Sequence, residues 1–176
     1  MSRFLTNYHG RVAHVEEPDE VDVIVDAWKR ERPDVDVSAM QVLSRVSRLA
    51  RHLDRARKQA FAAHDLETWE FDVLAALRRA GPPYDLSPGR LVAETMVTSG
   101  TMTNRVDRLV ARGLVERRPD PDDRRGVLVS LTASGRRTVD AALVELLAHE
   151  REILGALDTA EATRLADALR TLARSV

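Results

Sequence analysis

Short polar side chains and arginines between residues 98 and 132 are spaced as in proteins that read DNA. Thr101, Asn104 and Arg108 recur every three or four residues, which places them on one face of a helix. Such groups, together with a bidentate guanidinium, can reach base edges in a major groove without steric conflict. The predicted DNA-binding set on this helix consists of Ser99, Thr101, Thr103, Asn104 and Arg108.

A predicted β-hairpin follows that helix and carries arginines at its tip. Residues 114–118 and 127–131 have the pattern of short strands, and the Pro, Asp and Gly residues between them favour a turn. Arg124 and Arg125 lie at this turn, where Asp123 is close enough in sequence to orient a guanidinium through a salt bridge. An exposed arginine on a thin ribbon suits the narrow, electronegative minor groove. The alternatives are that the polar helix face is only solvated and that the charged turn only keeps the protein soluble. Because the helix and the hairpin follow each other directly, both alternatives are disfavoured.

The elements that must position these side chains are mostly helices. Residues 86–96 predict the helix before the reading helix, with Ser87 as its N-cap and Pro88 at its first helical position. Gly113 ends the reading helix itself. The buried stripe of the reading helix consists of Met102, Val106, Leu109 and Val110. Other apolar stripes predict helices over residues 21–28, 43–61, 66–77, 139–157 and 165–172.

These elements predict a mainly α fold (α+β), a winged helix-turn-helix with dimerisation helices at both chain ends. Two long apolar-striped helices are too many to bury against one small winged domain, so they predict a homodimer whose two reading helices recognise a palindrome. The predicted organisation is a flexible arm at 1–18, N-terminal helices that dimerise and wall a pocket at 19–64, the winged helix-turn-helix at 65–132, and C-terminal dimerisation helices at 133–176.

Three short motifs around the hairpin resemble those of the MarR family of bacterial transcriptional regulators. Family members end the recognition helix with a Gly-Leu-Val/Ile step, carry Asp-x-Arg in the wing, and continue with Leu-Thr-x-x-Gly. Here these motifs are residues 113–115, 123–125 and 131–135, and the resemblance extends over about residues 38–176. It implies a sequence-specific DNA-binding regulator that acts as a repressor on a palindromic operator.

Arg105 has a different position from the other arginines of the reading helix. It lies on the flank between the apolar stripe and the outward face, where a half-covered guanidinium needs an anionic partner. Asp72, on the helix around residues 66–77, is a candidate for that partner. A plain ion pair and a ligand-sensitive ion pair are equally compatible with this placement.

The chain further resembles the urate-responsive branch of the MarR family, which has an extra N-terminal helix that carries a Trp. That branch also has an Asp in the helix before the DNA-binding motif, an Arg late in the TxxNR segment of the recognition helix, and an Arg at the start of the wing, and all four positions match here. That resemblance implies that a small anion displaces the aspartate from its arginine and shifts the recognition helix. Both purines such as urate and tricarboxylates such as trans-aconitate or citrate remain open as the effector. The implied ligand-binding residues are Trp28, Asp72, Arg105 and Arg117.

Composition excludes several other classes of protein. The 176 residues contain no cysteine, which excludes disulfides, thiolate metal sites and thiol redox sensors. No nucleotide-binding, hydrolase or metalloprotease motif occurs, so we expect neither enzyme activity nor a cofactor. Without a signal-peptide pattern or a long apolar run, the expected location is cytoplasmic, with no membrane partner. A purely structural helical dimer and a zinc-responsive regulator remain alternatives, the latter using His9, His14, His52, His64 or His149.

The formal net charge of −1 conceals two segments of opposite sign. Residues 39–64 hold six basic side chains against one aspartate, whereas residues 1–36 hold nine acidic against five basic ones. Because DNA affinity depends on the patch that faces the phosphates, the net charge does not exclude DNA binding.

Overall fold

The computed structural model describes residues 17–123 and 125–175. Most of the expected N-terminal arm, and Arg124 at the expected wing tip, lie outside the described residues. The chain forms two compact units, the first ending at His52 and the second beginning at Leu53.

The N-terminal unit contains α1 (Glu20–Glu31) and the first half of α2 (Met40–Ala62). Asp19 caps α1 by accepting hydrogen bonds from the backbone of the first turn, and it also pairs with Arg45 of α2 at 2.8 Å. Arg45 pairs with Asp22 as well, at 2.9 Å, and Arg48 pairs with Glu20. Part of the positive charge of α2 is therefore neutralised by α1, so the two oppositely charged segments are partly joined to each other.

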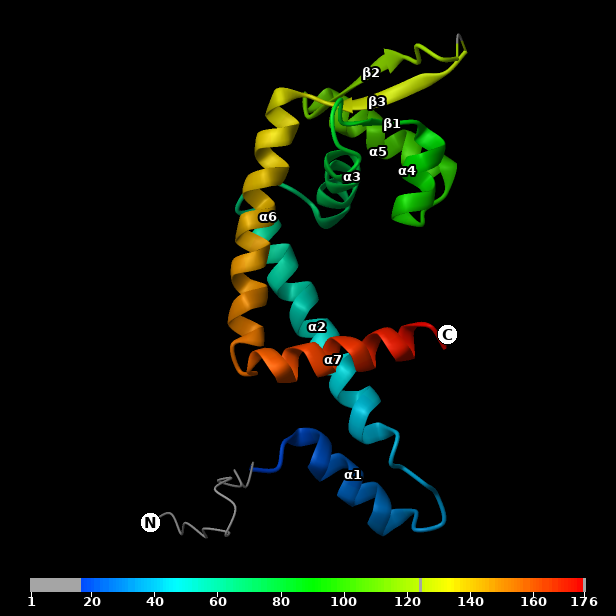
Figure 1. Ribbon diagram of the computed structural model, residues 1–176. Coiled ribbons are helices and arrows are strands. Elements are labelled where there is room, and N and C mark those ends of the chain that lie inside the picture. The colour runs from blue at the N-terminus through cyan, green and yellow to red at the C-terminus, as the bar shows by residue number, and fades with distance from the viewer. Residues whose placement is uncertain (1–16, 124, 176) are drawn as a thin grey trace. The chain divides into compact units, whose positions relative to one another are not determined.

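The second unit holds the remaining helices and one small antiparallel sheet with strand order β1-β3-β2 (Figure 1). β2 and β3 form a long hairpin, paired from Val115 opposite Leu131 to Pro119 opposite Val127. This architecture confirms the predicted mainly α fold with a winged helix-turn-helix. Its elements are α3 (Thr68–Arg79), β1 (Asp85–Leu86), α4 (Pro88–Thr95), α5 (Ser99–Ala111), β2 (Val115–Pro119), β3 (Val127–Leu131), α6 (Ala133–Leu154) and α7 (Thr159–Ala173).

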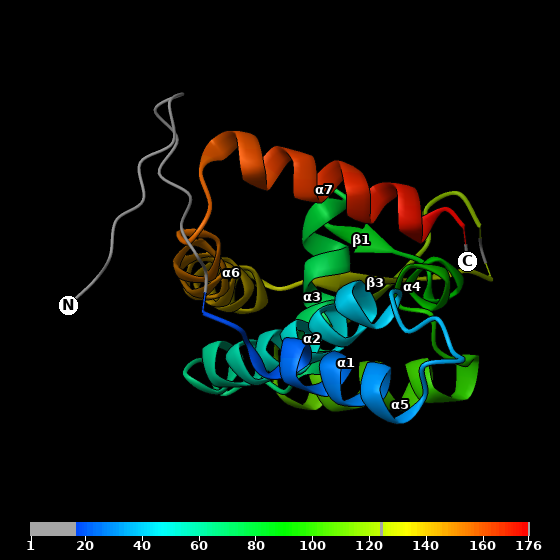
Figure 2. The same cartoon turned by 90° about the horizontal axis from the view of Figure 1, so that it is seen from below.

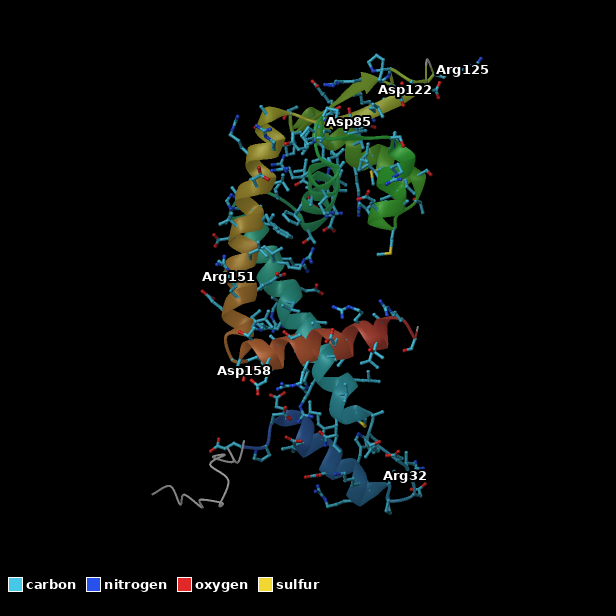
Figure 3. The ribbon with its side chains drawn as sticks, in the orientation of Figure 1. Arg32, Asp85, Asp122, Arg125, Arg151 and Asp158 are labelled. Carbon is cyan, nitrogen blue, oxygen red and sulfur yellow. The ribbon has the colours of Figure 1, made fainter. Side chains whose placement is uncertain are left out.

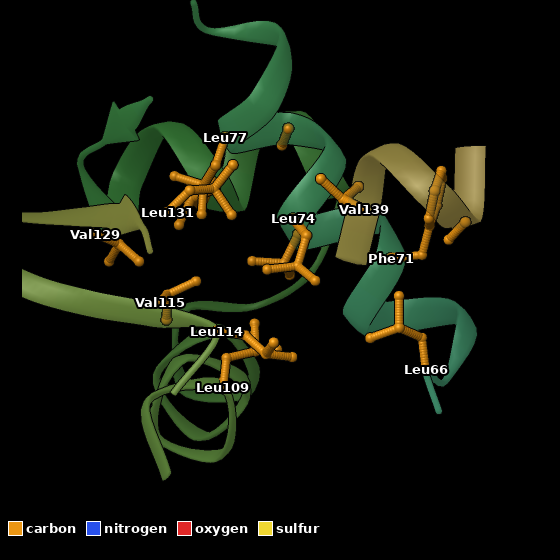
Figure 4. Packing of buried hydrophobic residues seen from close by; sticks show 14 of the residues in the cluster. Leu66, Phe71, Leu74, Leu77, Leu109, Leu114, Val115, Val129, Leu131 and Val139 are labelled. Atoms are coloured by element: carbon orange, nitrogen blue, oxygen red, sulfur yellow. The ribbon is translucent and has the colours of Figure 1, made fainter. Parts of the chain in front are cut away.

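Helix α3 forms the centre of the hydrophobic core. It lies between α6 on one side and α4 on the other in both views (Figures 1 and 2). Apolar side chains from α3, α5, β3 and α6 converge in a single cluster (Figure 4). Within it Leu74, Leu77 and Leu109 are fully buried, as are Met102 and Leu91. The apolar stripe therefore holds the reading helix α5 in the core, and the opposite side of this helix is exposed to solvent.

The start of helix α4 was predicted correctly, with Ser87 as its N-cap and Pro88 at its first position. Two other details of the sequence-based expectation were wrong. Leu86 was placed in the segment of that helix, but it pairs with Val129 in strand β1, because the free edge of β3 offers backbone partners that local sequence does not reveal. Val110, expected in the buried stripe of α5, is 37% exposed.

The apolar stripes that predicted a dimer stay largely uncovered within one chain. Val139 and Leu146 of α6 are buried, but α7 has no buried residue. Uncovered side chains along these stripes are Leu43, Val46 and Leu49 of α2, Leu143 and Leu147 of α6, and Leu165, Leu169 and Leu172 of α7.

A close backbone approach joins α6 to the base of the wing. Thr132 caps α6 and also donates its hydroxyl to the carbonyl of Gly113 at 2.8 Å, while its amide donates to the carbonyl of Leu114 at 3.2 Å. The first turn of α6 then lies so close that a Cβ on Gly135 would meet the Leu114 carbonyl oxygen at 2.0 Å. Only glycine fits at this position.

Replacing Gly135 by alanine is therefore expected to destabilise the protein by about 1–3 kcal/mol, because the new methyl group overpacks a rigid backbone contact. Gly89→Ala is the matched control, since a Cβ there meets nothing within 4 Å. It should be neutral or stabilising, by about 0.4–1 kcal/mol at most. Chemical denaturation measures both, and equal stabilities for the two variants would contradict the packing argument.

Candidate nucleic-acid interface and anion pocket

Helix α5 presents the predicted DNA-binding side chains to solvent. Thr98 caps the helix by accepting a hydrogen bond from the Thr101 amide at 3.3 Å. Thr101, Asn104 and Arg108 lie on the side away from the buried stripe, and Ser99 and Thr103 are exposed on its amino-terminal turns. The set has the expected exposure, and its contact with DNA remains a prediction.

The wing tip is held by hydrogen bonds of aspartates to backbone amides. Figure 3 shows Asp122 and Arg125 at the outer end of the hairpin. Asp123 accepts a hydrogen bond from the backbone amide of Arg125 at 2.9 Å, and Asp120 accepts one from Asp122 at the same distance. Asp123 was expected to form a salt bridge that orients a guanidinium. Its carboxylate instead bonds to the backbone of Arg125 and shapes the turn, and the Arg125 side chain is exposed.

Three arginines face the beginning of α3. Two of them belong to α5, and the third follows it immediately. Arg105 and Arg108 both lie over the Trp69 ring, at 5.4 and 4.7 Å from its centroid. Glu67 completes the cluster, because one carboxylate oxygen accepts the Trp69 indole N–H at 2.6 Å and the other accepts Arg108 at 2.7 Å. These two hydrogen bonds, the indole bond first, hold the pKa of Glu67 below its ordinary value.

Arg112, immediately after α5, makes the buried contact of this group. It donates to the Glu70 carboxylate at 2.5 Å and to Asp65 at 2.6 and 2.7 Å. Glu70 is only 1% exposed, and its hydrogen bond keeps the pKa of Arg112 above the ordinary value. The same carboxylate accepts the backbone amide of Glu67 at 2.9 Å. The carboxyl end of α5 is therefore anchored to the start of α3.

A hollow of about 580 Å³ opens beside Trp69, between α2, α3 and α5. That volume suits a small metabolite. Asp72 and Arg105 both line it, but they do not form the expected ion pair. Asp72 pairs instead with Arg57 of α2 at 3.2 Å, while Arg105 rests on the indole ring. The remaining lining residues are Lys58, Leu66, Glu67, Thr68 and Trp69.

The other two predicted ligand contacts lie elsewhere. Arg117 of β2 pairs with Asp107 of α5 at 2.7 Å and does not line the hollow. Trp28 belongs to α1 in the N-terminal unit, where its side chain is about half exposed. The structure thus brings together Asp72 and Arg105 of the predicted set, and the ligand role of all four residues remains a prediction.

Sequence reasoning missed Glu67, Trp69, Glu70 and Arg112. Their partners are 41 to 47 residues away along the chain, or on a neighbouring helix. The available signals were weak, namely an indole three residues before Asp72 and an acidic residue in the first turn of α3.

Comparison with known proteins supports the interpretation of this site. A family model described as the MarR family matches residues 64–126. Over 146 residues the chain is 40% identical to the HTH-type transcriptional regulator PecS of Dickeya dadantii (strain 3937), covering 83% of this chain and 88% of that relative. The chain belongs to the MarR family. It is accordingly a DNA-binding transcription regulator, like its relatives.

Solved MarR-family structures share its fold. A mutant of Escherichia coli MarR in complex with operator DNA has a TM-score of 0.64 and 28% identity, over 78% of this chain and 99% of that one. BpsR of Bordetella bronchiseptica, whose DNA binding is regulated by 6-hydroxynicotinic acid, has a TM-score of 0.65 and 29% identity, over 79% and 97%. In this MarR-family chain α4 and α5 form the helix-turn-helix, α5 is the recognition helix, and β2 and β3 form the wing.

The zinc alternative gains no support from side-chain positions. Within residues 17–123 and 125–175, no three His, Cys, Asp or Glu side chains gather so as to hold a metal ion. His9 and His14 lie outside that range, and His149 stands 3.6 Å from Glu145.

None of the helices in the described part of the chain is both long and apolar enough to cross a membrane.

Arg112→Ala is expected to destabilise this MarR-family protein by about 2–3 kcal/mol, since it leaves the Glu70 charge buried without its cationic partner. The expected loss is below the roughly 3–5 kcal/mol of fully buried pairs, because solvent reaches Arg112. Arg108→Ala is the control on the same helix and should cost much less, because both members of its ion pair are exposed. Urea unfolding compares the two, and similar losses would show that Glu70 is not the anchor.

Proposed function

We propose that this protein is a ligand-responsive repressor that binds palindromic operator DNA as a homodimer and is released by a small anionic metabolite. One observation supports the proposal most directly. Arg105, on the recognition helix itself, lines the hollow beside Trp69 and has no carboxylate partner among the residues that the structure describes. A ligand that contacts this guanidinium also contacts the element that reads DNA.

The charges around the hollow favour an anion. It has two carboxylates, but Asp72 is paired with Arg57, and Glu67 is paired with Arg108. Its two cations, Lys58 and Arg105, have no such partner within the described part of the chain. A bound carboxylate or urate anion gains charge-assisted hydrogen bonds from them. The hollow therefore has positive side chains available and negative ones already engaged.

Ligand binding changes DNA affinity only if it favours one conformation of the recognition helix over another. Arg105 supplies that difference, because an anion in the hollow attracts its guanidinium away from Trp69 and toward α2. Asp72, Trp28 and Arg117 stay in the proposed ligand-binding set, and of these three Asp72 alone lines the hollow. The effector is a purine such as urate or a tricarboxylate such as trans-aconitate or citrate, and regulation of BpsR by a small aromatic acid supports the anionic class.

The proposed dimer follows from the uncovered apolar stripes on α2, α6 and α7. A twofold mate would cover them and place two recognition helices about one helical turn of DNA apart. The proposed DNA contacts are Ser99, Thr101, Thr103, Asn104 and Arg108 in the major groove, and Arg124 and Arg125 in the minor groove.

The first experiment measures binding of the purified protein to the DNA upstream of its own gene, at fixed salt and pH, with urate, trans-aconitate, citrate or EDTA added separately. Release by one of the anions is expected, and it would identify the effector class. Release by EDTA alone would favour the zinc alternative. Binding that none of the four affects would contradict ligand control by these anions.

Two variants connect that release to the hollow. Arg105→Ala should bind DNA but lose the response to the anion. Asp72→Asn should respond at about 3- to 10-fold lower anion concentration, because it removes a charge that repels the ligand by roughly 1 kcal/mol after its partner Arg57 has offset part of the repulsion. Unchanged anion responses in both variants would place the effector elsewhere.

Arg125→Ala should weaken binding to all operator sequences alike, because the arginine anchors the wing without reading a particular base. The dependence of log affinity on log salt concentration should become shallower by about one unit for each wing removed. Arg170→Ala on α7 is the control for a lost exposed arginine. Unchanged affinity and salt dependence of Arg125→Ala would remove the wing from the interface.

A further inference from the structure

Glu67 holds the recognition-helix arginine that is proposed to read bases. Its carboxylate accepts Arg108 at 2.7 Å and the Trp69 indole N–H at 2.6 Å. The guanidinium of Arg108 in turn lies 4.7 Å from the centre of the indole ring. Arg108 is thus bound to the beginning of α3 by an ion pair and a cation–π contact at once.

This carboxylate borders the surface proposed to face DNA. A second hollow is lined by Glu67 and Trp69 together with Thr101, Asn104, Arg105 and Arg108. A carboxylate at such a place repels phosphate groups. The Glu67 and Arg108 side chains are 58% and 53% exposed, so DNA can reach both partners.

The ion pair is not needed to hold α5 in place. Arg112 already anchors the carboxyl end of the helix through the buried Glu70, and the apolar stripe holds its inner side. An exposed pair next to such an anchor adds little to the stability of the fold. Its effect therefore falls on Arg108, whose guanidinium it occupies.

We propose that Glu67 is an internal competitor for Arg108, so that binding to DNA requires this carboxylate to be exchanged for a base edge or a phosphate. The inference rests on the proposed assignment of Arg108 to the DNA interface. Glu67 is thus a positioning residue that limits operator affinity. In the free protein it keeps Arg108 against Trp69, and in the complex the guanidinium leaves the ring.

A double-mutant cycle tests this exchange with Glu67→Gln, Arg108→Ala and the combined variant, all measured on one operator fragment. Glu67→Gln keeps an acceptor for the indole N–H but removes the charge. It should tighten binding about two- to fivefold for each recognition helix engaged, which is the range for an exposed ion pair. In the Arg108→Ala background the same substitution should give no such gain.

The matched control is Glu94→Gln, which removes one partly exposed carboxylate, paired with Arg79, from α4 of the same unit. A gain from Glu67→Gln that persists without Arg108, or that Glu94→Gln reproduces, would show general charge repulsion and overturn the proposal. Weaker binding by Glu67→Gln would overturn it as well, since Glu67 would then present Arg108 to DNA. Failure of the unsubstituted protein to bind the operator at low salt would instead overturn the proposed function.

Trp69 provides a second measurement that a merely structural pair would not affect. In the Trp28→Phe background Trp69 is the only indole. Its emission should change when operator DNA removes Arg108 from the ring, and this change should be absent in the Arg108→Ala variant. Identical emission changes with and without Arg108 would contradict the exchange.

Discussion

The carbonyl group of Leu114 is the point where three functional elements meet. It accepts the amide and the hydroxyl of Thr132, and the first turn of α6 lies directly against it at Gly135. Leu114 itself follows the recognition helix and precedes β2 of the wing. The carboxyl end of the recognition helix, the base of the wing and the start of α6 therefore cannot shift independently. A rearrangement of α6 in the proposed dimer or on the proposed ligand binding would therefore reach the DNA-binding elements through backbone contacts.

The recognition helix is fixed at its carboxyl end and less restrained toward its amino end. Arg112 is paired with a buried glutamate, Arg108 with an exposed one, and Arg105, within the described part of the chain, only with an indole ring. The three arginines lie on one side of the helix, and their attachment weakens toward its amino terminus. The proposed ligand at Arg105 would consequently act on the part of the helix that carries Thr101 and Asn104, with the anchored carboxyl end as the pivot.

Periodicity within one element was readable from the sequence, and pairing between elements was not. A rotation of 100° per residue correctly separated the half-buried Arg105 from the exposed Arg108, and turn residues located the hairpin. The two-residue strand β1 escaped notice because its only support is the edge of β3, more than 40 residues later. Asp72 was assigned the wrong partner for a related reason, since the packing of α2 against α3, rather than any local pattern, supplies Arg57.

Pairing between elements also explains how a chain with a net charge of −1 can carry a DNA-binding surface. Arginines on or near that surface already have carboxylate partners, such as Glu67 for Arg108 and Asp107 for Arg117. Phosphates and base edges in the proposed complex must therefore replace internal anions, and not only release counterions from free guanidinium groups. The affinity for DNA then depends on the difference between the ion pairs within the protein and the contacts of the same arginines with DNA. A DNA site that contacts few of these arginines therefore binds weakly, however many basic residues the sequence contains.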